Sequence, residues 1–169
     1  YGQHFSEKLK KATQREKGAT VFGYHVKDPE NFGVIGFDNN GSIDSIEEKP
    51  TNPRSNYAVT GLYFYDQEVV SLAENTEASK RGELEITSIN NAYLTAGNLN
   101  VETLGRGFAW LDTGTHDSLL EAGHFVQTIE QRQDLKVACL EEIAFNKGWI
   151  TEKSLISSAK KLNNTNYGK

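Results

Sequence analysis

Three short charged segments of this sequence contain side chains that could carry chemistry. The first is Glu47-Glu48-Lys49-Pro50, where two carboxylates and an ammonium group end a run with strand character and a proline fixes the exit. Sheets of the α/β class place their ligands at the ends of strands. A lysine there can neutralise a phosphate while a carboxylate accepts hydrogen bonds from hydroxyls, a combination that suits a sugar phosphate. A solvated charge cluster before a loop is the alternative interpretation.

The second segment is Arg81-Gly82-Glu83-Leu84-Glu85. Gly82 permits an irregular backbone, and the acidic residues suit the N-terminal end of a helix, where they complement its dipole. This arrangement leaves Arg81 free to meet an anion. An ordinary charged helix start explains the same residues.

The third segment runs from Trp110 to Thr115 and contains Asp112 at the junction between a predicted strand and a turn. A carboxylate in such a place can hold Mg²⁺, which usually takes one or two protein carboxylates together with phosphates and water. Simple turn chemistry is the alternative, because aspartate is a common turn residue.

Several other classes of site are disfavoured by residue spacing. The histidines fit no zinc-ligand pattern, and no G-x-S-x-G nucleophile motif is present. Gly105-Arg106-Gly107 opens no helix and is only a fragment of a glycine-rich loop. The four histidines are His4, His25, His116 and His124.

Composition limits the protein class further. The chain has 169 residues, with 18 Lys and Arg against 23 Asp and Glu, and its formal net charge of −5 disfavours binding to nucleic acid. No apolar run is long enough to span a bilayer. The single cysteine, Cys139, cannot pair within the chain, which favours a reducing compartment and suggests the cytoplasm. Because the sequence contains no methionine, we expect a fragment or a processed chain.

Hydrophobic periodicity and turn residues predict the elements that must position these segments. In the first half we expect a helix over residues 6–17, strands over 19–26, 33–38, 42–48 and 57–65, and an Asn39-Asn40-Gly41 hairpin turn. In the second half we expect helices over 66–75 and 85–96, strands over 98–104 and 108–111, a long helix capped by Thr115, helices over 140–147 and 151–162, and a polar tail. This order predicts an α/β layer fold with a largely parallel sheet and a hairpin excursion.

Four motifs in a fixed order resemble the glucose-1-phosphate thymidylyltransferases of the sugar nucleotidylyltransferase family. They are EEKP, NYAVTGLYFYD, RGELEIT and WLDTGTHDSLLEAG, and the resemblance extends from Tyr1 to about Trp149. It implies a three-layer, mostly parallel mixed sheet of the nucleotide-diphospho-sugar transferase type, with extra C-terminal helices. The family's N-terminal strands, its glycine-rich nucleotide loop and its Gly-Asp-Asn metal motif have no counterpart here. We therefore expect the part of the enzyme that follows the nucleotide-binding region.

The resemblance also implies roles for single residues. Sugar hydroxyls would be held by the backbone of Gly33 and by Glu48, in a pocket lined by Val59 and Tyr63. The sugar phosphate would be held by Lys49 and Arg81. Asp112 would be the second carboxylate of an Mg²⁺ site. The implied reaction joins dTTP and glucose 1-phosphate into dTDP-glucose and pyrophosphate, the opening step of dTDP-rhamnose biosynthesis. No catalytic residue of this chain is assigned.

For the domain organisation, we expect a sugar-phosphate-binding part over residues 1–135, a helical oligomerisation and regulatory segment over 136–162, and a tail over 163–169. Glu142 and Ile143 keep the family's regulatory pattern, whereas Asn146 stands where related bacterial members commonly have arginine. The resemblance further implies a homo-oligomer, a tetramer in the family.

Two alternatives stay open. The chain could be a noncatalytic module that binds a sugar phosphate or drives oligomerisation, or the enzyme could use UTP or CTP in place of dTTP. Base recognition would belong to a region that this sequence lacks.

Overall fold

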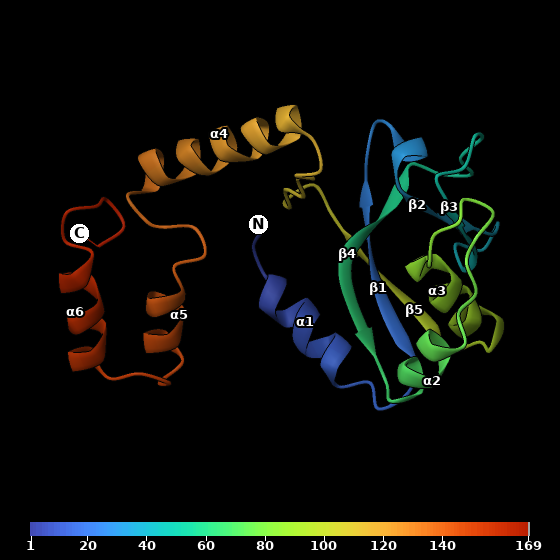
Figure 1. Cartoon of the computed structure of the whole chain (residues 1–169), viewed down its shortest axis with the longest axis horizontal. Coiled ribbons are helices and arrows are strands. Elements are labelled where there is room, and N and C mark those ends of the chain that lie inside the picture. Colours follow the sequence, from blue (N-terminus) through green and yellow to red (C-terminus); the bar gives the residue numbers. More distant parts are fainter. Residues whose placement is uncertain (169) are drawn as a thin grey trace. The chain divides into compact units, whose positions relative to one another are not determined.

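The structure is a computed structural model that describes residues 1–168 as two compact units (Figure 1). The first unit is Tyr1–Trp110, and the second begins at Leu111.

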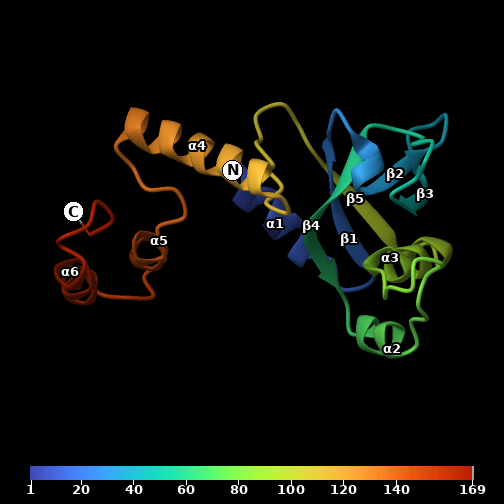
Figure 2. The same ribbon diagram turned by 45° about the horizontal axis from the view of Figure 1, so that its top comes forward.

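The first unit is built on a five-stranded sheet with the order β3-β2-β4-β1-β5 (Figures 1 and 2). Its strands are β1 (Ala19–His25), β2 (Gly33–Phe37), β3 (Ile43–Glu48), β4 (Tyr57–Tyr65) and β5 (Leu99–Leu104). Each coincides with a predicted strand to within one residue, because the β-branched and aromatic runs are sharply bounded by Gly, Pro and Asn. Residues 108–111 form no strand, and only an isolated bridge joins Phe108 to Gly2.

The sheet is mixed, as expected, but antiparallel pairing predominates in the described part. Strand β1 runs parallel to β5 and antiparallel to β4, while β2 is antiparallel to both β3 and β4. The α/β class is therefore confirmed. The parallel share is smaller than the sequence suggested, because the β2–β3 hairpin and the reversed β4 supply most of the pairings.

Helices cover both faces of this sheet (Figure 1). On one face, Ala12 of α1 (Phe5–Thr13) packs with Phe22 and Leu104. On the other, α3 (Ile86–Thr95) contributes Ile89 and Tyr93 to a core with strand residues, flanked by α2 (Glu68–Glu74). Alternation of side chains along β1 and β4 supplies both cores, as the period of two in a strand requires.

A buried carboxylate fastens α1 to the sheet. Glu102 of β5 is 7% exposed, and its Oε1 lies 2.7 Å from Lys11 Nζ and 3.1 Å from Arg15 Nη2. Lys8 Nζ lies 3.9 Å from the other oxygen. Burial raises the pKa of this carboxyl, but the hydrogen bonds from Lys11 and Arg15 outweigh it, so the pKa lies below its ordinary value. The charged form therefore stabilises the fold.

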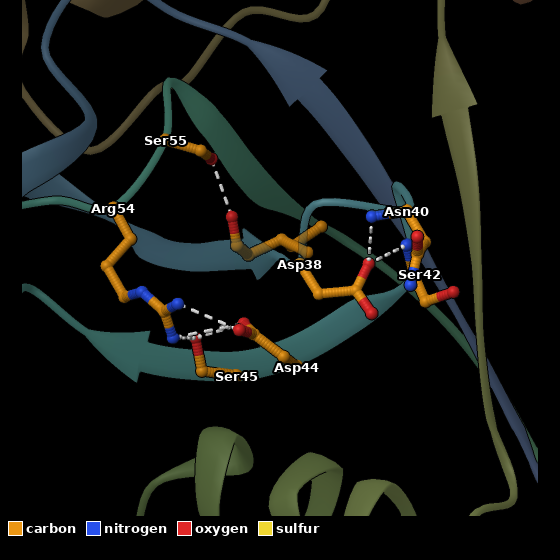
Figure 3. A network of polar contacts seen from close by, with 8 residues as sticks. Asp38, Asn40, Ser42, Asp44, Ser45, Arg54 and Ser55 are labelled. Carbon is orange, nitrogen blue, oxygen red and sulfur yellow. Dashed lines mark hydrogen bonds and ion pairs between the residues drawn. The ribbon is translucent and has the colours of Figure 1, made fainter.

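Polar contacts set the register of the β2–β3 hairpin (Figure 3). At its turn, Asp38 Oδ1 accepts hydrogen bonds from the backbone N–H groups of Asn40 and Ser42, at 2.9 and 2.8 Å. The Arg54 guanidinium donates to both oxygens of Asp44, at 3.1 and 2.8 Å. Because a slip of one residue would turn every side chain to the opposite face, this register decides where the strand's last residues point.

The second unit consists of α4 (His116–Gln133), α5 (Leu140–Asn146) and α6 (Glu152–Lys161). Helix α4 begins with the expected Thr115 cap, in which Thr115 and Ser118 exchange hydrogen bonds between side chain and backbone. No residue of these three described helices is buried. Among residues 1–168, no helix combines the length and the hydrophobicity that a membrane crossing requires. Residues 163–168 of the predicted tail have no helix or strand, and Lys169 lies outside the described residues.

Candidate functional site

The hairpin brings Gly33 and Glu48 opposite each other, at the start of β2 and the end of β3. Lys49 follows with a φ of 42°, and its backbone N–H donates to Phe32 O at 2.9 Å. This left-handed residue and the buried Pro50 end the strand abruptly. The segment EEKP is therefore an ordered strand end, and the chain turns away directly after two charged side chains.

Helix α3 crosses the same strand end and binds it through polar side chains. Thr87 Oγ1 donates to Glu48 Oε2 at 2.6 Å, and Asn91 Nδ2 donates to Ile46 O at 3.0 Å. Thr87 is 6% exposed, whereas the Glu48 side chain keeps 23% of its surface exposed. One oxygen of the Glu48 carboxylate is thus tied to the helix while the group still reaches solvent.

Gly33 makes room for this carboxylate. A Cβ atom at Gly33 would lie 3.2 Å from Glu48 Oε2, 3.4 Å from Thr87 Oγ1 and 3.8 Å from Val59 Cβ. These distances show that Gly33, Glu48, Val59 and Thr87 surround one small volume. A glycine at this position permits close approach of the backbone, which is what a backbone contact to a ligand needs.

Tyr63 lies four residues after Val59 on β4, and both side chains pack against the core on the same face of the sheet. Burial raises the pKa of the Tyr63 hydroxyl, and the nearby negative charge of Glu48 raises it further. Its ring stacks on Tyr65 with centroids 5.9 Å apart. Tyr63 therefore stays neutral at ordinary pH and presents a fixed aromatic wall with a hydroxyl.

Arg81 is not free, which corrects the expectation from the sequence. Its guanidinium lies 3.1 Å from Glu83, 3.3 Å from Glu85 and 3.8 Å from Glu48. The acidic residues after Gly82 therefore hold the arginine instead of only favouring the helix end. Ser79 Oγ, which donates to Glu85 Oε1 at 3.1 Å, completes this loop. An anion would have to compete with the three carboxylates, and 40% of the Arg81 side chain is exposed for it to do so.

Lys49 is the complementary cation. Its side chain is exposed, and its ammonium group has no hydrogen bond or ion pair with any described residue from 1 to 168. A lysine without a partner beside a carboxylate with a fixed orientation can bind a phosphate whose sugar the carboxylate holds.

Five of the predicted residues of the first unit thus gather around one strand end, with Lys49 directly beside them: Gly33, Glu48, Val59, Tyr63 and Arg81. Thr87 and Glu85 complete the group. The sequence reasoning missed Thr87, because a buried threonine in a helix resembles a core residue. Glu85 was considered only as a helix-end charge.

Asp112 belongs to the second unit, so its role in the same site stays a prediction. Its side chain is exposed, and its Oδ2 accepts the backbone N–H of Gly114 at 3.1 Å. Carboxylate oxygens of this kind are donors that Mg²⁺ accepts. Among residues 1–168, no group of three His, Cys, Asp or Glu side chains is arranged to bind a metal by itself.

The predicted regulatory residues Glu142 and Ile143 are exposed on α5, and so is Asn146. The contacts of the described residues do not bear on whether α5 binds a ligand. The regulatory site and the boundaries at residues 135 and 162 stay predictions.

Residues 1–129 match the family described as Nucleotidyl transferase, and the chain therefore belongs to that family. The resemblance inferred from the four motifs is confirmed.

Within that family, the chain is similar to proteins named glucose-1-phosphate thymidylyltransferase. It is 56% identical over 168 residues to one from Neisseria gonorrhoeae and 49% identical over 168 residues to one from Mycobacterium tuberculosis. Each alignment covers 99% of this chain and 58% of the relative. The chain thus spans well under two thirds of these proteins' length.

A crystal structure supports the same grouping. It is of a Bacillus anthracis protein named as a candidate glucose-1-phosphate thymidylyltransferase, in complex with sucrose. The match has a TM-score of 0.62 and 45% sequence identity, and it covers 70% of this chain and 47% of the other.

Proposed function

We propose that this chain forms the sugar-phosphate-binding part of an enzyme that transfers a thymidylyl group from dTTP to glucose 1-phosphate. The observation that carries this proposal is the cluster at the end of β3, where Glu48 is tied to a helix and the Lys49 ammonium group has no partner among residues 1–168. The similarity to named thymidylyltransferases supports the choice of nucleotide and sugar.

The cluster suits both ends of glucose 1-phosphate. Glu48 would accept hydrogen bonds from sugar hydroxyls, and the backbone at Gly33 would approach the sugar closely. Val59 and Tyr63 would line the pocket. Lys49 and Arg81 would neutralise the phosphate, with Arg81 exchanging carboxylate partners for phosphate oxygens.

In the reaction, an oxygen of the sugar phosphate attacks the α-phosphorus of dTTP in line. A new P–O bond forms, the bond to the bridging oxygen of the β-phosphate breaks, and pyrophosphate leaves with the electron pair. The residues named here would lower the barrier by positioning the nucleophile and neutralising its charge. No side chain of this chain needs to transfer a proton.

Mg²⁺ is the metal that we propose for the complete site. Asp112 would provide one carboxylate, because it is exposed and only one of its oxygens accepts a hydrogen bond from the backbone. When bound, the ion would supply positive charge to the phosphates in the transition state.

A pyrophosphate-release assay tests the proposal. A full-length version of the protein should release pyrophosphate from dTTP and glucose 1-phosphate, with UTP and CTP as the alternative nucleotides. We expect no turnover by residues 1–169 alone, because they span 58% of the relatives' length. A full-length protein without activity towards any nucleotide would favour the noncatalytic binding module, and preference for UTP or CTP would change the assigned base.

The second unit is proposed to mediate homo-oligomer formation. This unit exposes large apolar side chains, including those of Leu140, Phe145, Trp149 and Ile156. Exposed large apolar side chains in such number are typical of a contact surface. We place the regulatory site at Glu142 and Ile143 of the same unit. Together with a cytoplasmic location and a role in dTDP-rhamnose biosynthesis, these assignments rest on the family resemblance.

A further inference from the structure

Thr87 is a polar side chain of the cluster to which the proposed function assigns no role. It occupies the second position of α3, is 6% exposed, and makes a 2.6 Å hydrogen bond from Oγ1 to Glu48 Oε2. A hydroxyl that donates to a carboxylate in a buried place forms one of the stronger protein hydrogen bonds. Because the hydroxyl already donates to Glu48 Oε2, Glu48 is the group through which it would act.

The contacts of Glu48 show what this bond controls. Among residues 1–168, the one cation within 4.0 Å of this carboxylate is the Arg81 guanidinium, 3.8 Å from Oε1. That distance is too long for a hydrogen bond. Without the Thr87 bond, Glu48 could turn about its side-chain torsions and form a close pair with Arg81. Such a pair would occupy both the hydroxyl acceptor and a cation for phosphate.

We propose that Thr87 is a positioning residue that holds Glu48 for the sugar. By occupying one lone pair of Oε2, its hydroxyl presents the remaining lone pairs of the carboxylate to sugar hydroxyls and keeps Glu48 outside hydrogen-bonding distance of Arg81, at 3.8 Å. This inference rests on the proposed function, in which Glu48 binds glucose 1-phosphate. Thr87 touches neither the phosphate nor the reacting atoms.

Kinetics of a full-length version test the inference with two substitutions. Thr87→Val keeps the shape and removes the hydroxyl, while Thr87→Ser keeps the hydroxyl and removes a methyl group. We expect Thr87→Val to raise KM for glucose 1-phosphate by about tenfold, with kcat and the KM for dTTP within about twofold of wild type. Thr87→Ser should restore most of the loss.

Deoxy substrates separate positioning from general packing. Among the monodeoxyglucose 1-phosphates, one analogue lacks the hydroxyl that donates a hydrogen bond to Glu48. The KM for that analogue should be unaffected by Glu48→Gln. The penalty of Thr87→Val should disappear with that same substrate. Equal penalties with every analogue, or a Thr87→Ser variant as impaired as Thr87→Val, would overturn the inference.

A crystal structure of full-length Thr87→Val gives a result that does not depend on turnover. We expect the Glu48 carboxylate to move towards Arg81 and to come within hydrogen-bonding distance of it. A carboxylate that keeps its wild-type position contradicts the inference even if glucose 1-phosphate is not the substrate. Inactivity of the wild-type protein would instead contradict the proposed function.

Discussion

Two carboxylates on opposite faces of the same sheet have different surroundings. Glu102, on the face covered by α1, is almost fully buried and lies within ion-pair distance of three cations. Glu48, on the face covered by α3, is partly exposed, takes a short hydrogen bond from a neutral hydroxyl, and lies beside a lysine that has no partner among the described residues.

The contrast distinguishes a structural cluster from the cluster that we propose as the binding site. Around Glu102 the described side chains already supply hydrogen bonds from two cations, so little capacity remains for a ligand. Around Glu48 the charges are arranged but only partly paired, and the substrate can supply what is missing. Loss of the first carboxylate should therefore affect stability, and loss of the charges around the second should affect binding.

The largest effect on the structural side of this comparison is expected for Glu102→Ala. Removal of a buried, charged hydrogen-bond acceptor should lower the free energy of unfolding by about 1.5–3 kcal/mol. Urea denaturation of a full-length version measures the change, and kcat/KM for glucose 1-phosphate should stay the same. Glu77→Ala is the matched control, since Glu77 is exposed and has no ion pair among residues 1–168. Equal free energies of unfolding for the two variants would contradict a structural role of Glu102.

Gly33→Ala tests whether the space between Gly33 and Glu48 belongs to the proposed sugar site. The added Cβ would lie 3.2 Å from Glu48 Oε2, so the carboxylate must shift by a few tenths of an ångström. We expect KM for glucose 1-phosphate to rise roughly 3- to 10-fold, because the hydroxyl contact loses its geometry. Gly105→Ala serves as the control, since a Cβ there meets nothing within 4 Å. A Gly33→Ala enzyme with wild-type KM would show that this volume is not part of the sugar site.

Acid should weaken the structural cluster. The folded state holds the pKa of Glu102 below its ordinary value of 4.5, so the unfolded state binds the proton more readily. The stabilisation is complete well above pH 4.5 and is lost as the pH falls through the lower, folded-state pKa. Urea midpoints of wild type and Glu102→Gln should therefore converge towards low pH. A constant difference between them from pH 6 to pH 3 would contradict this linkage.

The smallest effect is expected at Arg81, which belongs to the Glu48 cluster and is also held by ion pairs with its own loop. Glu83 is 61% exposed on its side chain and lies 3.1 Å from Arg81. Exposed ion pairs contribute about 0–1 kcal/mol, so Glu83→Gln should release the arginine cheaply. We expect KM for glucose 1-phosphate to fall by up to about threefold. An increase in KM would mean that Glu83 orients Arg81 for the phosphate.

Local patterns predicted the strands well because Asn39-Asn40-Gly41, Pro50 and Gly97 mark their ends through backbone conformations that other residues avoid. They could not predict the three carboxylates around Arg81 or the bond from Thr87 to Glu48. The latter joins residues 39 positions apart, and it depends on how α3 packs across β3. Glu48, Lys49 and Arg81 were singled out by their chemistry as well, whereas Gly33, Val59 and Tyr63 came from motif resemblance alone, which carries three-dimensional information that periodicity lacks. Asp112 remains a prediction because it lies in the other unit.

The most direct test of the binding cluster is the kcat/KM of full-length Lys49→Ala for glucose 1-phosphate. Loss of a charged contact to the phosphate should lower it by about 10- to 150-fold, equivalent to about 1.5–3 kcal/mol of transition-state stabilisation, with the melting temperature unchanged. Unchanged kinetics would contradict the assignment and identify EEKP as a solvated charge cluster at the end of a strand.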